Sequence, residues 1–140
     1  MKQKESVRAF KNELRNYNYY LSRVVSLTNS IEWCFERLGG IRGIDPSKEP
    51  LHIVPDKDYE YKVRDDIERF EAQKKLIEAK IKYIDEILNL IENPLKWAII
   101  SIYIENKRTD SIASELYLSP HGLHSRINRT ISKAIDEKTQ

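Results

Sequence analysis

The stretch that decides the fold runs from Lys107 to Ala134 and reads KRTDSIASELYLSPHGLHSRINRTISKA. Its apolar residues recur at helical spacing in two runs, which predict two short helices packed on a common core. These residues are Ile112, Ala113 and Leu116 in the first run and Leu123, Ile127, Ile131 and Ala134 in the second. We expect Thr109 and Ser119 to cap the two helices, because a hydroxyl accepts an unpaired N–H at a helix start. Pro120 suits the first position of the second helix, so the layout is that of a helix-turn-helix.

The face of the second helix opposite its apolar stripe is polar and carries no acid. No Asp or Glu occurs between Leu116 and Ile135, although the chain has 22 acidic residues. Asn pairs bidentately with adenine, Arg with guanine or a phosphate, and Ser with either kind of partner. We therefore predict that this helix enters the major groove of double-stranded DNA, with Asn128 as the main base reader. The predicted DNA-binding residues are Thr109, Ser119, His121, Ser125, Arg126, Asn128, Arg129 and Lys133.

Two long apolar repeats precede this unit. In residues 3–38 and 59–92 the apolar positions alternate by three and four, which predicts two long helices with heptad seams. The first seam is Val7, Phe10, Leu14, Tyr17, Leu21, Val24, Thr28, Ile31, Phe35 and Leu38. The second is Val63, Ile67, Phe70, Ile77, Ile81, Ile84, Leu88 and Ile91, interrupted by Lys74. Gly39-Gly40 is expected to end the first helix, and the residues around 39–58, rich in Gly and Pro, are expected to form a loop.

These patterns predict an all-α protein with two domains. Residues 1–92 would form a long two-helix antiparallel coiled-coil arm, and residues 93–140 a small trihelical helix-turn-helix unit. Asn93-Pro94 would end the arm and cap the first helix of that unit. Isoleucine-rich seams also pair between chains, so a homodimer through the arm remains an alternative.

Composition narrows the function classes. Basic residues outnumber acidic ones in residues 1–40 and 93–140, whereas acids prevail in residues 41–92, a division that would let both ends face DNA. The one cysteine, Cys34, excludes an internal disulfide and fits a reducing cytoplasm. No apolar run is long enough to span a membrane. His121 and His124 share a helix face, but a zinc site needs four ligands and no further ones are near, so we expect no metal site. We also expect no cofactor and no enzymatic activity.

The segment Leu95–Ala134 resembles the sigma-factor domain that reads the upstream promoter element. The matching residues are Tyr103, Arg108-Thr109, Ile112-Ala113, Leu116, Ser119 and Leu123. The whole chain, with a helical arm ahead of the motif IASELYLSPHGLHSRI, resembles the small phage late-gene regulators of the ArpU/RinA type. That resemblance implies a phage-encoded, sequence-specific transcription regulator whose arm dimerises it or contacts RNA polymerase.

Two departures from the family pattern favour a different hypothesis. Tyr117 stands at the turn where such units carry glycine, which implies a different turn or strain. Arg126 stands where an apolar residue is expected, with Ile127 next to it. The alternative is a coiled-coil adaptor with a degenerate helix-turn-helix, acting in phage assembly or as an inhibitor of a host protein.

Overall fold

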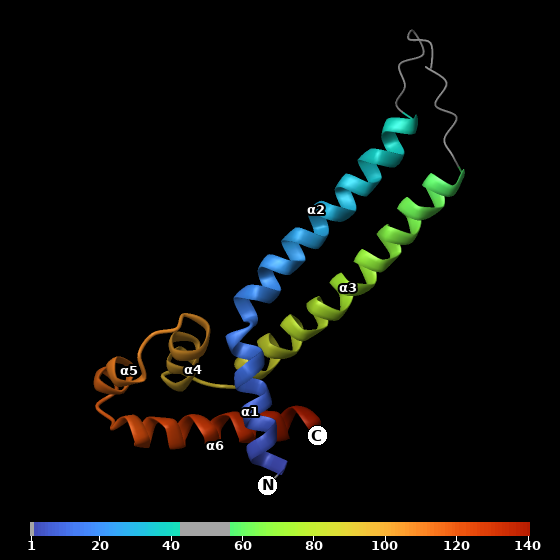
Figure 1. The fold of residues 1–140 in the computed structure, drawn as a ribbon. Helices are drawn as coiled ribbons and strands as arrows, with labels where there is room; N and C mark the ends of the chain where they lie inside the picture. Colours follow the sequence, from blue (N-terminus) through green and yellow to red (C-terminus); the bar gives the residue numbers. More distant parts are fainter. Residues whose placement is uncertain (1, 43–56) are drawn as a thin grey trace. The chain divides into compact units, whose positions relative to one another are not determined.

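The computed structural model describes residues 2–42 and 57–140. Over these ranges the chain forms six α-helices and one π-helix without any strand, which confirms the all-α prediction (Figure 1). The helices are α1 (Lys2–Arg15), α2 (Tyr17–Arg42), α3 (Lys57–Asn89), α4 (Leu95–Ile99), the π-helix η1 (Ile100–Ile104), α5 (Thr109–Glu115) and α6 (Pro120–Thr139). The predicted loop at 39–58 lies largely outside the described residues.

Two compact units divide the chain. The first consists of the residues up to Tyr20 together with Ala79–Gln140, and the second of Leu21–Glu78. The sequence predicted one division between residues 92 and 93. In the structure α1 and the last part of α3 belong to the same compact unit as α4–α6. The domain division between residues 92 and 93 stays a prediction.

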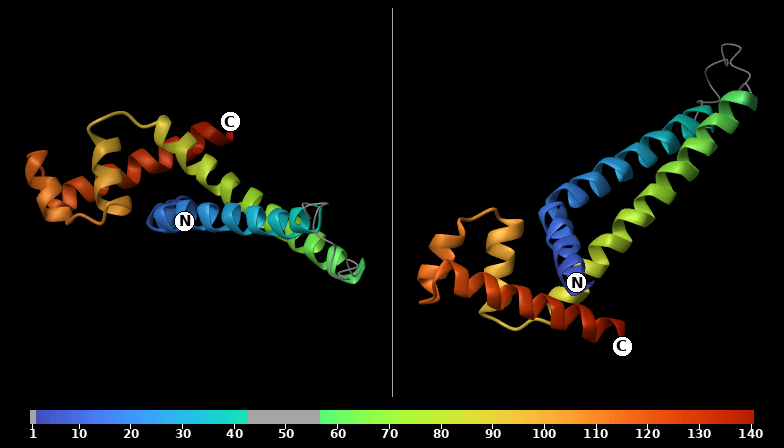
Figure 2. Two further views of the ribbon diagram at one scale, coloured as in Figure 1. Left: turned by 90° about the horizontal axis from the view of Figure 1, so that it is seen from above. Right: turned by 60° about the horizontal axis from the view of Figure 1, so that its bottom comes forward.

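Helix α6 is the centre of the first unit. It contacts α1, α4 and α5. Helix α1 crosses α6 in the view of Figure 1, and the left view of Figure 2 shows the two helices beside each other. The four predicted core positions of α6, Leu123, Ile127, Ile131 and Ala134, are all buried, as that prediction required. The same unit also buries Phe10 and Leu14 of α1, Ala98 and Ile99 of α4, Tyr103 of η1, and Ile112 and Ala113 of α5. Lys138 also donates to Glu86, which ties the end of α6 to α3.

The second unit is an antiparallel pair of helical segments. Arg23 Nη2 on α2 lies 3.3 Å from Gln73 Oε1 on α3. Further along α2, Arg37 Nε donates to the Tyr59 hydroxyl at 2.8 Å. From the first pair to the second, the residue number rises on α2 and falls on α3, so the two segments are antiparallel. Between them Cys34 packs against Val63 and Ile67.

The first predicted seam is wrong in phase within α2. Leu27 and Cys34 are buried, whereas Phe35 is 54% exposed and the Thr28 hydroxyl donates to the Val24 carbonyl of its own helix. A small thiol fits between two closely packed helices, which an aromatic ring at the same depth would hold apart. The second predicted seam is confirmed near its ends by burial of Val63, Ile67, Ile84 and Leu88 in α3 and of Ile91 just after it.

Several predicted helix boundaries also differ. The helix expected over residues 3–38 divides at Asn16 into α1 and α2, and α2 continues through Gly39 to Arg42. Glycine within a helix costs only about 1 kcal/mol relative to alanine, so it need not end one. Thr109 is the first residue of α5 and not its cap; Arg108 occupies that position without a side-chain bond. Pro94 is the cap residue of α4, and the Oδ1 of Asn93 just before it accepts the Trp97 N–H at 3.1 Å.

The turn between α5 and α6 closes around Tyr117, which has a φ of 58°. The Tyr117 N–H donates to the Ser114 carbonyl at 3.2 Å, and the Leu118 N–H to the Ala113 carbonyl at 2.9 Å. This pair of bonds is the Schellman arrangement, in which glycine usually takes the left-handed position. A tyrosine there has its side chain 96% exposed, so the backbone strain is not offset by packing of the ring. The strained turn anticipated from the sequence is therefore present.

Replacing Tyr117 with glycine should stabilise the first unit by about 1 kcal/mol, because glycine adopts the left-handed conformation without strain. The matched control is Tyr19→Gly, at a position in α2 whose side chain is also largely exposed. There glycine should destabilise the same unit by roughly 0.5 kcal/mol through lost helix propensity. Urea unfolding of both variants measures the two signs, and destabilisation by Tyr117→Gly would contradict the assignment of the turn.

The buried thiol provides a probe of the second unit. Cys34 is the only cysteine and is 1% exposed, so its reaction with an aromatic disulfide reagent requires the helix pair to open. We expect labelling of the native protein to be at least roughly a hundredfold slower than labelling of the urea-unfolded chain. Equal rates would mean that α2 and α3 do not pack around Cys34.

Candidate nucleic-acid interface

The start of α6 is fixed by a side-chain cap, as predicted. The Ser119 hydroxyl accepts the Gly122 N–H at 3.0 Å, and Pro120 occupies the first turn. Gly122 allows this close approach, because a Cβ built there would lie 3.0 Å from the Ser119 Oγ. The cap and the buried stripe together set which side of α6 faces outward.

The outward side of α6 holds most of the predicted DNA-binding residues. His121, Arg126, Arg129 and Lys133 are exposed, and Ser125 and Asn128 are half-buried. Thr109 lies apart from them at the start of α5, where it is half-buried, and Ser119 is exposed at the cap. Six of the eight predicted residues thus share one helix, whereas Thr109 and Ser119 lie at helix starts.

Helix α1 crosses this face and contributes residues that were not among the predicted site. The Lys11 Nζ donates to the Asn128 Oδ1 and lies 3.5 Å from the His124 Nε2. It also lies 5.5 Å from the centroid of the Tyr103 ring, which Arg15 approaches at 5.4 Å. Asn128 is therefore held by α1, with one of the two lone pairs of its carbonyl oxygen already in use.

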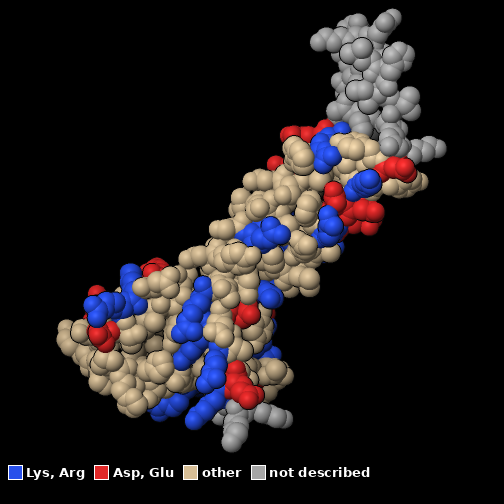
Figure 3. All heavy atoms as spheres, in the orientation of Figure 1, with Lys and Arg blue, Asp and Glu red and all other residues tan. Residues whose placement is uncertain are grey.

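A groove of about 810 Å³ separates α1 from the outward side of α6. Its cationic lining comes from Lys4, Arg8, Lys11 and Arg15 of α1 and from Arg129 and Lys133 of α6. His124, Asn128 and Ser132 add neutral polar groups, and Asp136 is the one acid in this lining. Figure 3 shows Lys and Arg side chains gathered over the part of the first unit that contains α1. A concave surface with this charge attracts anions.

Burial and neighbouring charge disfavour further protonation in the groove. Burial lowers the pKa of Lys11 below its ordinary value, and the positive charge of Arg15 lowers it further. Burial also lowers the pKa of His124, with the charge of Lys11 as the next cause. Neutral His124 can accept a hydrogen bond from Lys11, whereas the imidazolium would repel it. The local field is therefore positive, with Asp136 as the one acid of the lining.

The signal that could have identified α1 is present in the sequence. Lys4, Arg8, Lys11 and Arg15 follow one another at spacings of four, three and four, which places all four on one helix face. The sequence prediction places Val7, Phe10 and Leu14 on the adjacent face in the arm, and it does not relate the basic row to the DNA-binding helix. Only the packing of α1 on α6 brings that row to the predicted DNA-binding helix.

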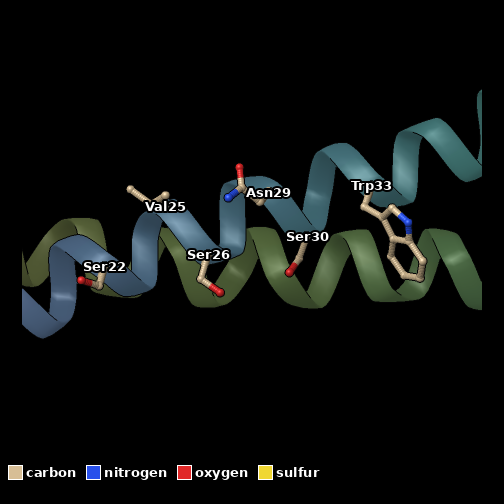
Figure 4. Close-up of a pocket in the computed structure, with 6 residues that line it drawn as sticks. All are labelled: Ser22, Val25, Ser26, Asn29, Ser30 and Trp33. Atoms are coloured by element: carbon tan, nitrogen blue, oxygen red, sulfur yellow. The ribbon is translucent and has the colours of Figure 1, made fainter.

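A second hollow lies within the second unit, on α2. It has a volume of about 450 Å³ and is lined by Ser22, Val25, Ser26, Asn29, Ser30 and Trp33 (Figure 4). Val25 and Trp33 are 60% and 59% exposed. The Arg37 guanidinium lies 4.5 Å from the Trp33 ring centroid. This surface is mixed in polarity and carries no cluster of ionisable groups.

Two further observations concern the whole described part of the chain. None of its helices combines the length and apolar character needed to cross a bilayer. No three His, Cys, Asp or Glu side chains within residues 2–42 and 57–140 are arranged to hold a metal ion.

The pKa of His124 makes the stability of the first unit depend on pH. Because the folded protein holds this pKa below 6.5, the unfolded chain binds a proton at higher pH than the folded chain does. Stability should therefore fall as the pH drops from 7 through 6.5 toward the folded-state value. In Lys11→Met the imidazole should titrate at higher pH, because the nearest positive charge is gone.

Proton NMR titration of the three histidines measures this shift, and His124→Gln assigns the resonance. His121→Gln is the second assignment variant, at an exposed position of the same helix. An unchanged His124 titration in Lys11→Met would contradict the contact between α1 and α6.

Comparisons with protein-family models, with curated proteins and with solved structures found no match to this chain.

Proposed function

We propose that the protein is a sequence-specific DNA-binding transcription regulator in which α5 and α6 act as a helix-turn-helix. One observation carries the proposal: the side of α6 opposite its buried stripe is polar, accessible and free of acid from Leu118 to Ile135. In helix-turn-helix proteins the second helix lies in the major groove and meets base edges with its first turns. His121 and Ser125 occupy those turns here.

The residues of α6 divide by the geometry of their groups. His121, Ser125 and Asn128 are suited to base edges, because their donors and acceptors can pair with specific edge patterns. Arg126, Arg129 and Lys133 are suited to phosphates, which position the protein without reading sequence. Ser119 keeps its hydroxyl proton for a phosphate oxygen while its oxygen accepts the Gly122 N–H. Thr109 would contact the backbone from the start of α5.

Lys11 gives Asn128 a defined orientation for this role. Because Nζ donates to Oδ1, the amide Nδ2 is left to donate to adenine N7, and the second lone pair of Oδ1 can accept from adenine N6. A side chain held in advance loses less entropy on binding than a free one. Asn128 is thus proposed as the main base reader, with its amide oriented by Lys11 of α1.

The resemblance to phage late-gene regulators extends the proposal. It makes the protein phage-encoded and cytoplasmic, and it gives the second unit the task of dimerising the chain or contacting RNA polymerase. The helical repeat of α2 and α3 is compatible with the proposed coiled-coil arm, and α4–α6 with the proposed trihelical unit.

One observation favours the alternative of an interaction or adaptor protein. Val25 and Trp33 are more than half exposed beside a hollow on α2, and exposed apolar side chains of this size commonly mark protein contacts. In that case α5 and α6 would be a degenerate helix-turn-helix. The two candidates differ in whether the purified protein binds DNA in a salt-dependent way.

Titration on duplex DNA tests the proposal. Asn128→Ala should weaken binding to the preferred duplex, selected from a random pool, by about 1–3 kcal/mol, with little change on random duplexes. Lys133→Gln should weaken binding to both by similar factors and reduce the slope of log K against log salt by about one unit.

The matched control is Lys75→Gln on α3, an exposed lysine of the second unit, which should leave both affinities and the slope unchanged. If the unmodified protein does not bind duplex DNA at low salt, the adaptor function replaces the proposal. If Asn128→Ala changes specific and random binding equally, Asn128 holds the backbone and reads no base.

A further inference from the structure

The groove between α1 and α6 brings like charges together from two sides. Lys4, Arg8, Lys11 and Arg15 form one wall, and Arg129 and Lys133 project from the other. Like charges at close range destabilise one another, most strongly where solvent is partly excluded. Asp136 alone among the lining residues has the opposite charge. The folded chain thus keeps a concentration of positive charge that its own described residues do not neutralise.

Lys11 is the extreme case. It is only 9% exposed, yet the groups that it contacts within the described ranges are a neutral amide, an imidazole and an aromatic ring, with no carboxylate. A buried charge normally requires a charged or hydrogen-bonding partner for each of its donors. Asn128 and His124 account for two of the three N–H donors of the ammonium group. Among the residues that the structure describes, no acceptor is assigned to the third, which remains available to an anion in the groove.

We infer that the α1–α6 groove is a phosphate-binding site centred on Lys11. A phosphate presents several oxygens in a tetrahedral arrangement, so one group can accept from Lys11 while bridging to cations of both walls. The guanidinium groups of Arg8, Arg15 and Arg129 can each bind two oxygens in a fork. A carboxylate, with two oxygens in one plane, cannot span both walls in this way.

This inference deepens the proposed function and rests on it for the source of the phosphate. On a DNA-binding protein the phosphate is one of the duplex backbone, and α1 becomes part of the DNA interface beside Asn128. The chemistry of the site also accepts a free phosphate or diphosphate. The experiment therefore contains one arm for each source.

The first arm measures thermal unfolding of the full chain in pyrophosphate, with sodium chloride matched for ionic strength. Pyrophosphate should raise the unfolding temperature above the chloride series, because it binds the folded state alone. Lys11→Met should weaken the fitted affinity roughly tenfold or more, as expected for loss of a charged hydrogen bond. Arg8→Gln, at an exposed position with a lower risk to folding, should weaken it severalfold, and Lys75→Met should have no effect.

The second arm measures duplex binding with pyrophosphate as competitor at fixed ionic strength. We expect competition in the unmodified protein, together with weaker duplex binding by Lys11→Met and Arg8→Gln. Absence of pyrophosphate stabilisation, or equal stabilisation in all variants, overturns the phosphate site and leaves the proposed function standing if duplexes still bind. Pyrophosphate binding without any duplex binding rejects the proposed function and retains the groove as a site for free phosphate compounds.

Discussion

Burial of the apolar stripe on α6 is the constraint on which the first unit depends. Leu123, Ile127, Ile131 and Ala134 are inaccessible only because α1, α4 and α5 cover them from different directions. Each fully buried aliphatic side chain contributes roughly 1.5–3 kcal/mol relative to exposure, so these few positions hold four helices together. The same burial fixes the rotation of α6 and thereby decides which polar side chains face outward. Burial of this apolar stripe therefore determines both the packing of the helices and the position of the candidate site.

The spacing of apolar residues predicted the features that depend on local sequence, but it did not predict which residues two helices bury between them. The core positions and the Ser119-Pro120 start of α6 follow from spacing and capping chemistry, and the structure has them. The seam of α2 was placed on Thr28 and Phe35, whereas Leu27 and Cys34 are buried. Both sets satisfy a three-four alternation, so spacing alone does not distinguish them. Local pattern cannot supply that information.

The candidate site shows the same limit. The polar residues of α6 could be identified on one helix, because helical geometry relates them without reference to other elements. The contribution of Lys11 could not, since it depends on contact between residues 113 and 117 positions apart in the chain. The π-helix η1 is a similar case: Glu105 N–H bonds to the Ile100 carbonyl, one residue further back than in an α-helix, and Tyr103 turns into the core. The sequence ISIYI of residues 100–104 does not itself predict a π-helical turn.

The order in which the two units are encoded has a consequence for folding during synthesis. The second unit is contiguous, so all its contacts can form once Glu78 has left the ribosome. The first unit combines residues up to Tyr20 with residues from Ala79 onward, so α1 can reach its native contacts with α6 only after α6 has been translated. During that interval Val7, Phe10 and Leu14 lack their native covering, a condition that favours misassembly or chaperone binding. The four cations of α1 lie beside these residues, and like charge on neighbouring chains opposes their association. The basic row would thus oppose association of nascent chains first, and would form one wall of the α1–α6 groove once the protein has folded.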